Sequence, residues 1–184
     1  MMQKIVGYGA IAGLVAGGAV SLTALGVGDH SIGGWGMAIG YLIMLAALST
    51  IFVAIKRQRD VAGGGVIGFW SAFGLGAAIS VVASLVYALC WDAALAIGHI
   101  QFGHSYAAST IAEAKSRGMT PDALAKLTAE MTRFAEKYDG SILYRLPMSM
   151  MEILPVGLVV SLVSAWLLWK GLFLPVRASG EASA

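Results

Sequence analysis

The carboxylate of Glu152 stands alone within a long apolar stretch of the chain, residues 146–169, which has no other charged side chain. A carboxylate inside a bilayer is costly and commonly marks the path of an ion, a proton or a substrate. Pro147 and Pro155 bracket it, and Pro155 frees a backbone carbonyl about one turn earlier. Glu152 therefore predicts either a polar site within a membrane or a hydrogen-bonded carboxyl that fixes helix pairing.

Two further charged residues, Asp92 and Arg145, are expected near the same membrane face as Glu152. Asp92 directly follows Trp91, and Arg145 directly precedes the apolar stretch that contains Glu152. The three charged side chains could therefore approach one another and contact an ion or a substrate. The simpler alternative is an interfacial salt bridge between Asp92 and Arg145.

No pattern of a metal centre or a catalytic site is apparent elsewhere. His30, His99 and His104 are all expected on the outer side, but His99 and His104 are five residues apart, not the three or four that share a helix face. No cysteine or carboxylate completes a ligand spacing. The glycine run at 63–65 lacks the Lys-Ser/Thr pair of a phosphate loop. We predict no metal, no cofactor and no catalytic residue. This favours a non-enzymatic protein, with a membrane-embedded enzyme acting on lipid as a distant alternative.

Four apolar stretches must position these residues. They cover about 5–27, 31–55, 66–91 and 146–169, and the first three contain no Asp, Glu, Lys or Arg. A bilayer crossing needs about 20 apolar helical residues. The chain is 58% hydrophobic and 12% charged, whereas soluble domains average about 25% charged residues. We predict an all-α integral membrane four-helix bundle, a single membrane domain over 1–177 followed by a flexible tail over 178–184.

The distribution of basic residues predicts the orientation of the bundle. Lys56, Arg57 and Arg59 lie between spans two and three, whereas the connection at 28–30 has no basic residue. Because cytoplasmic loops are enriched in Lys and Arg, both termini are expected in the cytoplasm and residues 97–145 outside. The first span is too long for a signal-peptide core and is expected to be retained. We expect a multi-pass membrane protein.

Small residues recur at four-residue spacing within the spans. Span one has Gly9, Gly13 and Gly17, span two has Gly40 four residues after another glycine, and span four has Gly157 four residues before a serine. Such faces let helix backbones approach closely. The pattern predicts packing inside the bundle, and the alternative is a dimer formed through span one.

The segment between spans three and four predicts a helical hairpin over about 93–140, outside the membrane. Its first helix is expected to continue from span three to Lys115, and Thr120-Pro121 predicts the start of the second helix. Apolar residues on this helix step by three or four positions and share a face: Leu124, Leu127, Met131, Phe134 and Tyr138. We expect this face to pack on the extension of span three; the outer leaflet and a second protein are the alternatives.

Two longer stretches and a short turn carry a family resemblance. The stretches are residues 52–60, which continue through a glycine- and aromatic-containing segment to 72, and residues 150–162; the turn is 118–122. Together they resemble the bacterial domain-of-unknown-function 4199 family over nearly the whole chain. The resemblance implies a four-span bacterial membrane protein with an outer helical insertion, and we therefore expect it in the bacterial cytoplasmic (inner) membrane. It implies no activity and assigns a role to no residue.

These observations favour a non-enzymatic membrane protein that acts through partners, as an accessory or interaction subunit or as a homo-oligomer. Its expected surroundings are the lipid bilayer and another membrane protein or a second copy. The net charge of +2 and the absence of a basic run exclude a nucleic-acid partner. The alternative is a small transporter or ion-coupled carrier that uses Glu152, and four spans would then require a dimer.

Overall fold

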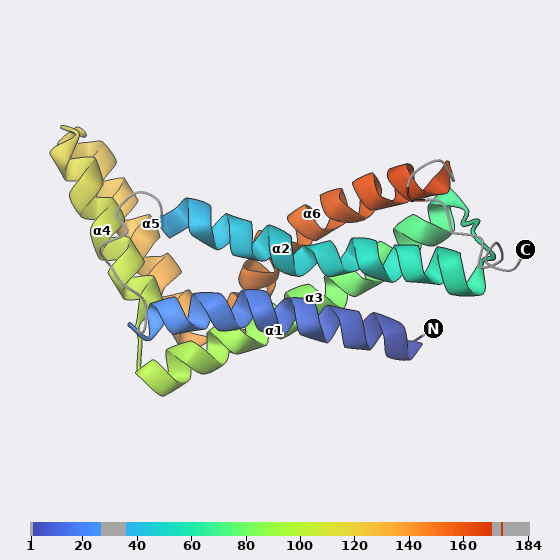
Figure 1. Ribbon diagram of the computed structural model, residues 1–184. Helices are drawn as coiled ribbons and strands as arrows, with labels where there is room; N and C mark the ends of the chain where they lie inside the picture. The colour runs from blue at the N-terminus through green and yellow to red at the C-terminus, as the bar shows by residue number, and fades with distance from the viewer. Residues whose placement is uncertain (1, 27–35, 171–173, 175–184) are drawn as a thin grey trace, which may run out of the picture.

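The computed structural model describes residues 2–26, 36–170 and 174, and this part of the chain is all-α, as predicted (Figure 1). The helices are, in order, α1 (Met2–Ala24), α2 (Gly36–Arg57) with a π-helical turn η2 (Gln58–Ala62), α3 (Phe69–Gly98), α4 (Phe102–Ser116), α5 (Pro121–Gly140) and α6 (Ile142–Trp169). The expected connection at 28–30 and the expected tail at 178–184 lie outside the described residues.

Four of these helices are long and apolar enough to cross a membrane, which confirms a multi-pass membrane protein. The spans are Met2–Ala24, Ala38–Ala62, Phe69–Ile97 and Ile142–Trp169. An α-helix satisfies all its backbone groups internally, as the hydrocarbon core demands. The third and fourth spans have 29 and 28 residues, about 42 Å of helix, and therefore exceed a hydrocarbon core of about 30 Å.

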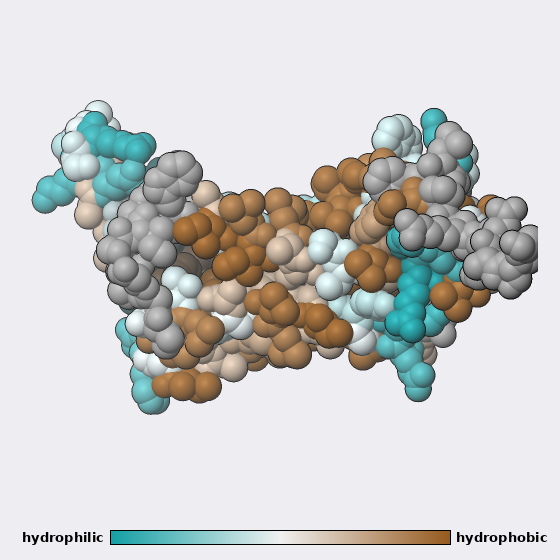
Figure 2. Space-filling view, viewed as in Figure 1, coloured by the Kyte–Doolittle hydropathy of each residue, from teal (hydrophilic) through white to brown (hydrophobic). Residues whose placement is uncertain are grey.

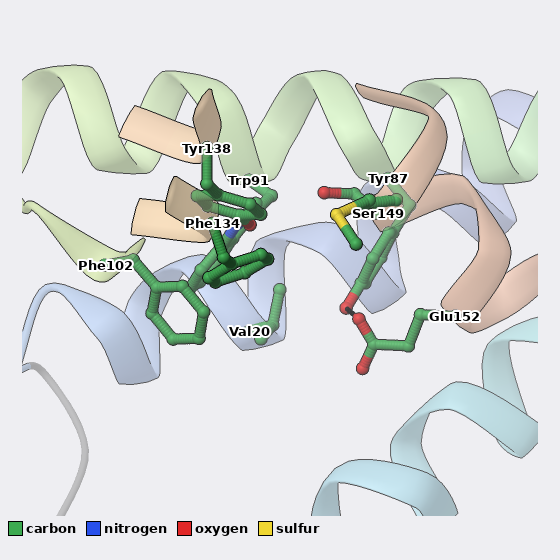
Figure 3. Close-up of a pocket in the computed structure, with 9 residues that line it drawn as sticks. Val20, Tyr87, Trp91, Phe102, Phe134, Tyr138, Ser149 and Glu152 are labelled. Carbon is green, nitrogen blue, oxygen red and sulfur yellow. Dashed lines mark hydrogen bonds between the residues drawn. The ribbon is translucent and has the colours of Figure 1, made fainter. Parts of the chain in front are cut away.

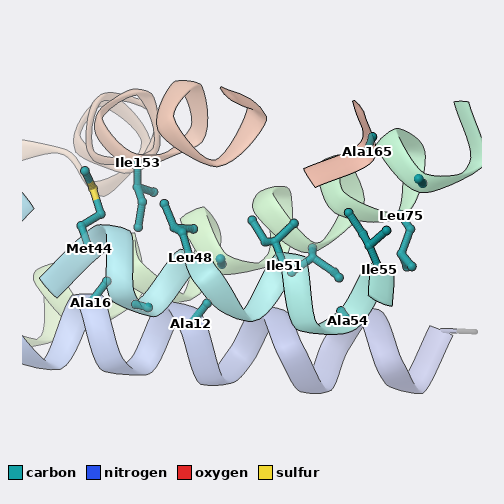
Figure 4. Packing of buried hydrophobic residues seen from close by; sticks show 14 of the residues in the cluster. Ala12, Ala16, Met44, Leu48, Ile51, Ala54, Ile55, Leu75, Ile153 and Ala165 are labelled. Atoms are coloured by element: carbon teal, nitrogen blue, oxygen red, sulfur yellow. The ribbon is translucent and has the colours of Figure 1, made fainter. Parts of the chain in front are cut away.

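The bundle is built around α3, which packs along both α1 and α6, while α2 closes the remaining side against α1 and α6. Figure 4 shows Leu48 and Ile51 of α2 directed away from α1, toward α3 and α6, with Ala12 of α1 beneath α2. Leu48, Ile51 and Ile153 are almost entirely buried. Apolar side chains face outward around this core, and Figure 2 shows them as a broad band between two more hydrophilic ends.

The glycines of α1 bring its backbone against α3. A Cβ atom at Gly9 would lie 2.6 Å from Cβ of Val82, and one at Gly13 would lie 2.6 Å from the carbonyl oxygen of Ala83. A Cβ at Gly17 would lie 2.8 Å from Cβ of Cys90. Since α3 already occupies this face, pairing of two copies through it would require α3 to be displaced.

Between α3 and α6, each of two glycines faces a serine of the other helix. A Cβ at Gly157 would lie 2.7 Å from Oγ of Ser80, and a Cβ at Gly76 would lie 2.7 Å from Oγ of Ser161. The two buried hydroxyls lie 3.2 Å apart, and each also donates to a carbonyl four residues earlier on its own helix. Gly40 differs, because nothing lies within 4 Å of a Cβ built there.

One end of the bundle gathers the amino terminus, the η2 turn and the end of α6 (Figure 1). Lys4 Nζ donates to Oε1 of Gln58 at 3.2 Å, and Lys56 pairs with Asp60 at 2.5 Å. Arg59 is fully buried, and its Nη2 donates to the carbonyl oxygen of Leu174 at 2.6 Å. The basic residues of the second connection therefore lie at the same end as the amino-terminal lysine.

The opposite end carries the α4–α5 hairpin (Figure 1), and here the structure differs from the expected boundaries. The first hairpin helix does not continue from α3, because α3 ends at Gly98 and His99 adopts a left-handed conformation with φ 49°. The hairpin itself covers residues 102–140 rather than 93–140, and α6 begins at Ile142 rather than at 146. The break allows α4 to turn away from the axis of α3.

The second hairpin helix, α5, has the expected bounds and the expected amphipathic form. Thr120 has an extended backbone and Pro121 is the first helical residue, so this start uses the proline preference for the first helical position. Its apolar face, which includes Phe134 and Tyr138, packs against α4. The charged residues of its other side are exposed: Asp122, Lys126, Glu130, Arg133 and Lys137.

The close packing of α1 on α3 gives a direct test. Replacement of Gly13 by Ala should lower the free energy of unfolding by about 1–3 kcal/mol, because the new methyl group meets a backbone carbonyl and Val86. Gly18→Ala on the same helix is the matched control and should have no destabilising effect, since nothing lies within 4 Å of its Cβ position. SDS titration in mixed micelles, followed by circular dichroism, measures both. Equal effects of the two changes would contradict this packing.

Candidate functional site

A cavity of about 340 Å³ lies where the hairpin meets the bundle (Figure 3). Five helices, α1, α3, α4, α5 and α6, contribute to its lining. Of the described residues that line it, most are aromatic and only Glu152 is charged; the principal members are Tyr87, Trp91, Phe102, Phe134, Tyr138 and Glu152. Helices remote in sequence thus place aromatic rings and one carboxylate around a common space.

Glu152 reaches this cavity from α6 and is bonded to α3. The hydroxyl of Tyr87 donates to Oε2 of Glu152 at 2.9 Å. Tyr87 is 5% exposed, so its ring is fixed within the bundle, whereas Glu152 is an exposed residue in the isolated chain. Pro155 has no N–H to donate to the carbonyl of Met151, which adds an acceptor close to the carboxylate. The site therefore combines an anchored hydroxyl with an accessible acidic group.

Arg145 joins three helices beside the cavity. Its Nε donates to Oδ1 of Asp92 on α3 at 2.7 Å, Nη2 donates to the same oxygen, and Nη1 donates to the carbonyl oxygen of Tyr138 on α5 at 2.8 Å. Its Cζ atom also lies 5.8 Å from the centre of the Tyr138 ring. We call Asp92, Arg145 and Tyr138 the clamp, because they hold the hairpin on the bundle.

Aromatic contacts extend the clamp into the cavity wall. Nε1 of Trp91 donates to the hydroxyl of Tyr138 at 2.9 Å. The ring of Phe102 meets that of Trp91 edge-on at 5.3 Å and lies 5.6 Å from that of Tyr138. Phe134 lies 5.4 Å from Tyr138, measured between ring centres. These contacts pack the first turns of α4 and the last turns of α5 over the end of α3.

The structure arranges the predicted charged residues as two pairs. Asp92 bonds to Arg145, as the salt-bridge interpretation anticipates, while Glu152 bonds to Tyr87. Glu152 and Arg145 are seven residues apart on α6 and therefore lie about two turns apart on one side of that helix. Gly9, Gly13, Gly17 and Gly157 do not line the cavity but lie at the helix contacts described above, and Gly17 packs against the backbone of Tyr87, which does line it.

The aromatic wall of the cavity, formed by Trp91, Phe102, Phe134 and Tyr138, was not predicted as a site from the sequence. Phe134 and Tyr138 were identified only as members of an apolar stripe, and Tyr87 was given no role. A signal was present, because Tyr87 and Trp91 are four residues apart, as are Phe134 and Tyr138, and such pairs share a helix face. The sequence does not indicate that the chain changes direction between α3 and α4, and this change brings Phe102 next to these pairs.

Asp139 fixes the fold of the hairpin at its base. Its Oδ1 accepts from the N–H of Gly103 at 2.9 Å, and its Oδ2 accepts from the N–H of His104 at 3.0 Å and lies 2.6 Å from Nδ1 of His104. Asp139 on α5 thus satisfies the free N–H groups in the first turn of α4. Burial alone would raise the pKa of this carboxyl, but the bonds from Gly103 and His104 outweigh it and hold the pKa below its usual value.

The two described histidines take separate places. His104 is bonded to Asp139, His99 directly follows the last residue of α3, and His30 lies outside the described residues. Within the described part of the chain, no three side chains of His, Cys, Asp or Glu are grouped as metal ligands. For contact with a ligand, the described lining of the cavity offers aromatic faces, one carboxylate and hydroxyl groups.

Comparison with known proteins identifies one family. The family model described as "Protein of unknown function (DUF4199)" matches residues 8–170, which confirms the resemblance drawn from the sequence. No curated protein and no solved structure matches the chain.

The clamp predicts a site-specific loss of stability. Arg145→Gln should lower the free energy of unfolding by about 1.5–3 kcal/mol, because Asp92 loses its charged partner in a half-buried position. The matched control is Arg117→Gln, which breaks an exposed pair with Glu113 and should cost only about 0–1 kcal/mol. SDS titration of both variants measures the difference. If they proved equally stable, the clamp would have no energetic role.

The cap formed by Asp139 predicts a pH dependence of the hairpin. Because the folded-state pKa lies below the usual value of 3.8, the contribution of the cap is complete above that value. It is lost as the pH falls through the lower, folded-state pKa. Hydrogen exchange at residues 103–106, corrected for the intrinsic rate, should therefore show protection that is constant above about pH 5 and decreases toward pH 2.

Asp139→Asn provides the comparison for this experiment. The amide keeps the shape of the side chain but offers only one acceptor oxygen, so it cannot accept from both N–H groups as the carboxylate does. Protection at residues 103–106 should be lower at pH 7 and should no longer depend on this titration. A wild-type profile that matches the Asp139→Asn profile across the range would refute the cap.

Proposed function

Because the chain belongs to the DUF4199 family of proteins of unknown function, we propose a role from its geometry: it is a non-enzymatic accessory or interaction subunit of the bacterial inner membrane. The observation that carries this proposal is the hairpin, which is clamped to the bundle at its base and leaves its charged side exposed. A pre-organised surface loses little conformational freedom when it binds a partner, and this favours recognition.

Several contacts support a hairpin that acts as one rigid body. The Tyr106 and Phe134 rings meet at 5.9 Å between α4 and α5, and Asp139 ties the first turn of α4 to the end of α5. The exposed side of α5 presents alternating acidic and basic residues, such as Glu130 and Arg133. A surface of mixed charge suits a protein partner better than an anionic lipid surface, which would select a basic face.

The proposed orientation places the hairpin outside the cytoplasm and both termini within it. The basic residues Lys4, Lys56 and Arg57 lie at the end of the bundle opposite the hairpin (Figure 1), and cytoplasmic connections favour such residues. The exposed hairpin would then meet an extracytoplasmic domain of a partner, or of a second copy in a homo-oligomer.

Single cysteines test both the orientation and the partner. In a Cys90→Ala background, a membrane-impermeant maleimide should label Glu130→Cys in intact cells and should label Arg57→Cys only after the membrane is opened. A photo-activated cross-linker at residue 130 should then give one discrete adduct in native membranes, identified by mass spectrometry. The matched control is Arg57→Cys, which should not give that adduct.

Two outcomes would contradict the proposal. Labelling of residue 57 in intact cells would reverse the orientation. Absence of any adduct from residue 130 and from other exposed hairpin positions, together with a monomer in native membrane extracts, would exclude the interaction role.

A second candidate is a small carrier, and Glu152 is the observation that favours it. The carboxylate lines a cavity in the membrane-spanning bundle, and four spans can form a pathway if two copies associate. The distinguishing property of a carrier is movement of the ligand across the membrane, as opposed to retention at the cavity.

A further inference from the structure

The lining of the cavity combines one negative charge with aromatic walls (Figure 3). We propose that it binds a small organic ammonium ion, with the nitrogen against Glu152 and the apolar groups of the ligand against Trp91, Phe134 and Tyr138. The inference deepens the carrier proposal by naming the class of ligand. It concerns binding alone, which is measured separately from transport.

Charge is the first argument. Among the described residues, Glu152 is the only charged one that lines the cavity, and none of their ion pairs includes it. Arg145, which precedes it by two turns on α6, is engaged by Asp92 and by the carbonyl of Tyr138. A cationic ligand would therefore supply the opposite charge that the protein does not, where low polarity strengthens the attraction.

The aromatic wall is the second argument. The faces of Trp, Tyr and Phe rings attract cations that lie within about 6 Å of the ring centre, and aromatic cages recognise quaternary ammonium groups in this way. Trp91, Phe134 and Tyr138 are held by the hydrogen bond and ring contacts described above, so the wall exists before a ligand arrives. A pre-formed wall costs little ordering on binding.

The donor set argues against an inorganic ion. Hard cations such as Ca²⁺ take six to eight oxygen ligands. Here the oxygen-bearing side chains at the carboxylate are Tyr87, whose hydroxyl donates to it, and Ser149, whose hydroxyl donates to the carbonyl of Arg145 at 3.2 Å. Apolar substituents on an ammonium nitrogen suit these surroundings better than a hydration shell does.

The size and position of the cavity restrict the ligand further. About 340 Å³ lies near the lower end of the range of about 300–1,000 Å³ for small-molecule sites. Glu152 and the neighbouring Met151 are exposed on the bundle, so a ligand can approach from the membrane side. The ammonium group could belong to the headgroup of an aminophospholipid or to a free amine, and the two share the same chemistry at the site.

The test uses the full-length protein in nanodiscs of phosphatidylglycerol, with radiolabelled benzyltrimethylammonium as the probe. The probe should bind saturably. Neopentylbenzene, in which carbon replaces the charged nitrogen, should compete at least about tenfold more weakly than unlabelled probe, because it lacks the charge that Glu152 and the rings recognise.

Three variants assign the binding to this cavity. Glu152→Gln keeps the shape of the side chain and should weaken the probe at least about tenfold, and Phe134→Leu, which removes one ring face, should weaken it several-fold. Glu130→Gln, an exposed carboxylate on α5, is the matched control and should leave binding unchanged. The SDS unfolding midpoint of each variant shows whether a loss of binding reflects a loss of fold.

Three results would overturn the proposal: no saturable binding to the wild-type protein, equal competition by neopentylbenzene, or unchanged binding by a folded Glu152→Gln variant. Phosphatidylethanolamine added to the nanodiscs distinguishes the two sources of the ammonium group. This lipid should compete with the probe if the site takes a lipid headgroup, and it should not compete if the site takes a free amine. Release of entrapped probe from vesicles containing the protein tests the carrier proposal separately. Binding without release would exclude the carrier and leave the ammonium site intact.

Discussion

The position of the hairpin on the bundle depends on the guanidinium group of Arg145. This group bonds α3 through Asp92 and α5 through the carbonyl of Tyr138, while α6 supplies the arginine itself. The planar, multiply donating guanidinium is suited to this arrangement, because one lysine nitrogen could not reproduce its fixed geometry. Without this connection, the described side-chain contacts between α5 and α3 would be the Trp91–Tyr138 hydrogen bond and contacts between rings, and the α5 side of the cavity would be held less firmly.

The shape of the cavity also depends on close contacts between the helices of the bundle, which leave them little room to move. Within lipid, apolar side chains gain little by leaving the hydrocarbon, so helix association relies on close contact and on hydrogen bonds. The glycines of α1 and the glycine–serine contacts between α3 and α6 provide both. They fix α3 relative to α1 and α6, and this in turn fixes Tyr87 relative to Glu152. The geometry of the polar site is thus set by helix contacts outside the cavity lining, and the contact of Gly17 with the backbone of Tyr87 links the two.

Much of this fold could be predicted from the sequence because a bilayer restricts the alternatives. Long uncharged stretches have to be helices there, and the proline and amphipathic pattern of α5 gave its bounds correctly. The end of α3 was not predicted, because Gly98, which directly precedes the left-handed His99, is a single glycine, and α3 contains Gly74 and Gly76 without ending at either. That break decides where Phe102 lies, so the aromatic wall was not foreseen, although Asp92 and Arg145 were recognised as residues that could meet.

The most direct test of this account is a distance across the hairpin and the bundle in lipid. Spin labels at Thr128→Cys on α5 and Val15→Cys on α1, both at exposed positions and in a Cys90→Ala background, permit a pulsed electron resonance measurement. The account predicts one narrow distance distribution, which broadens when Arg145 is replaced by Gln. A broad distribution in the parent protein, or one that Arg145→Gln leaves unchanged, would contradict a hairpin held rigidly on the bundle.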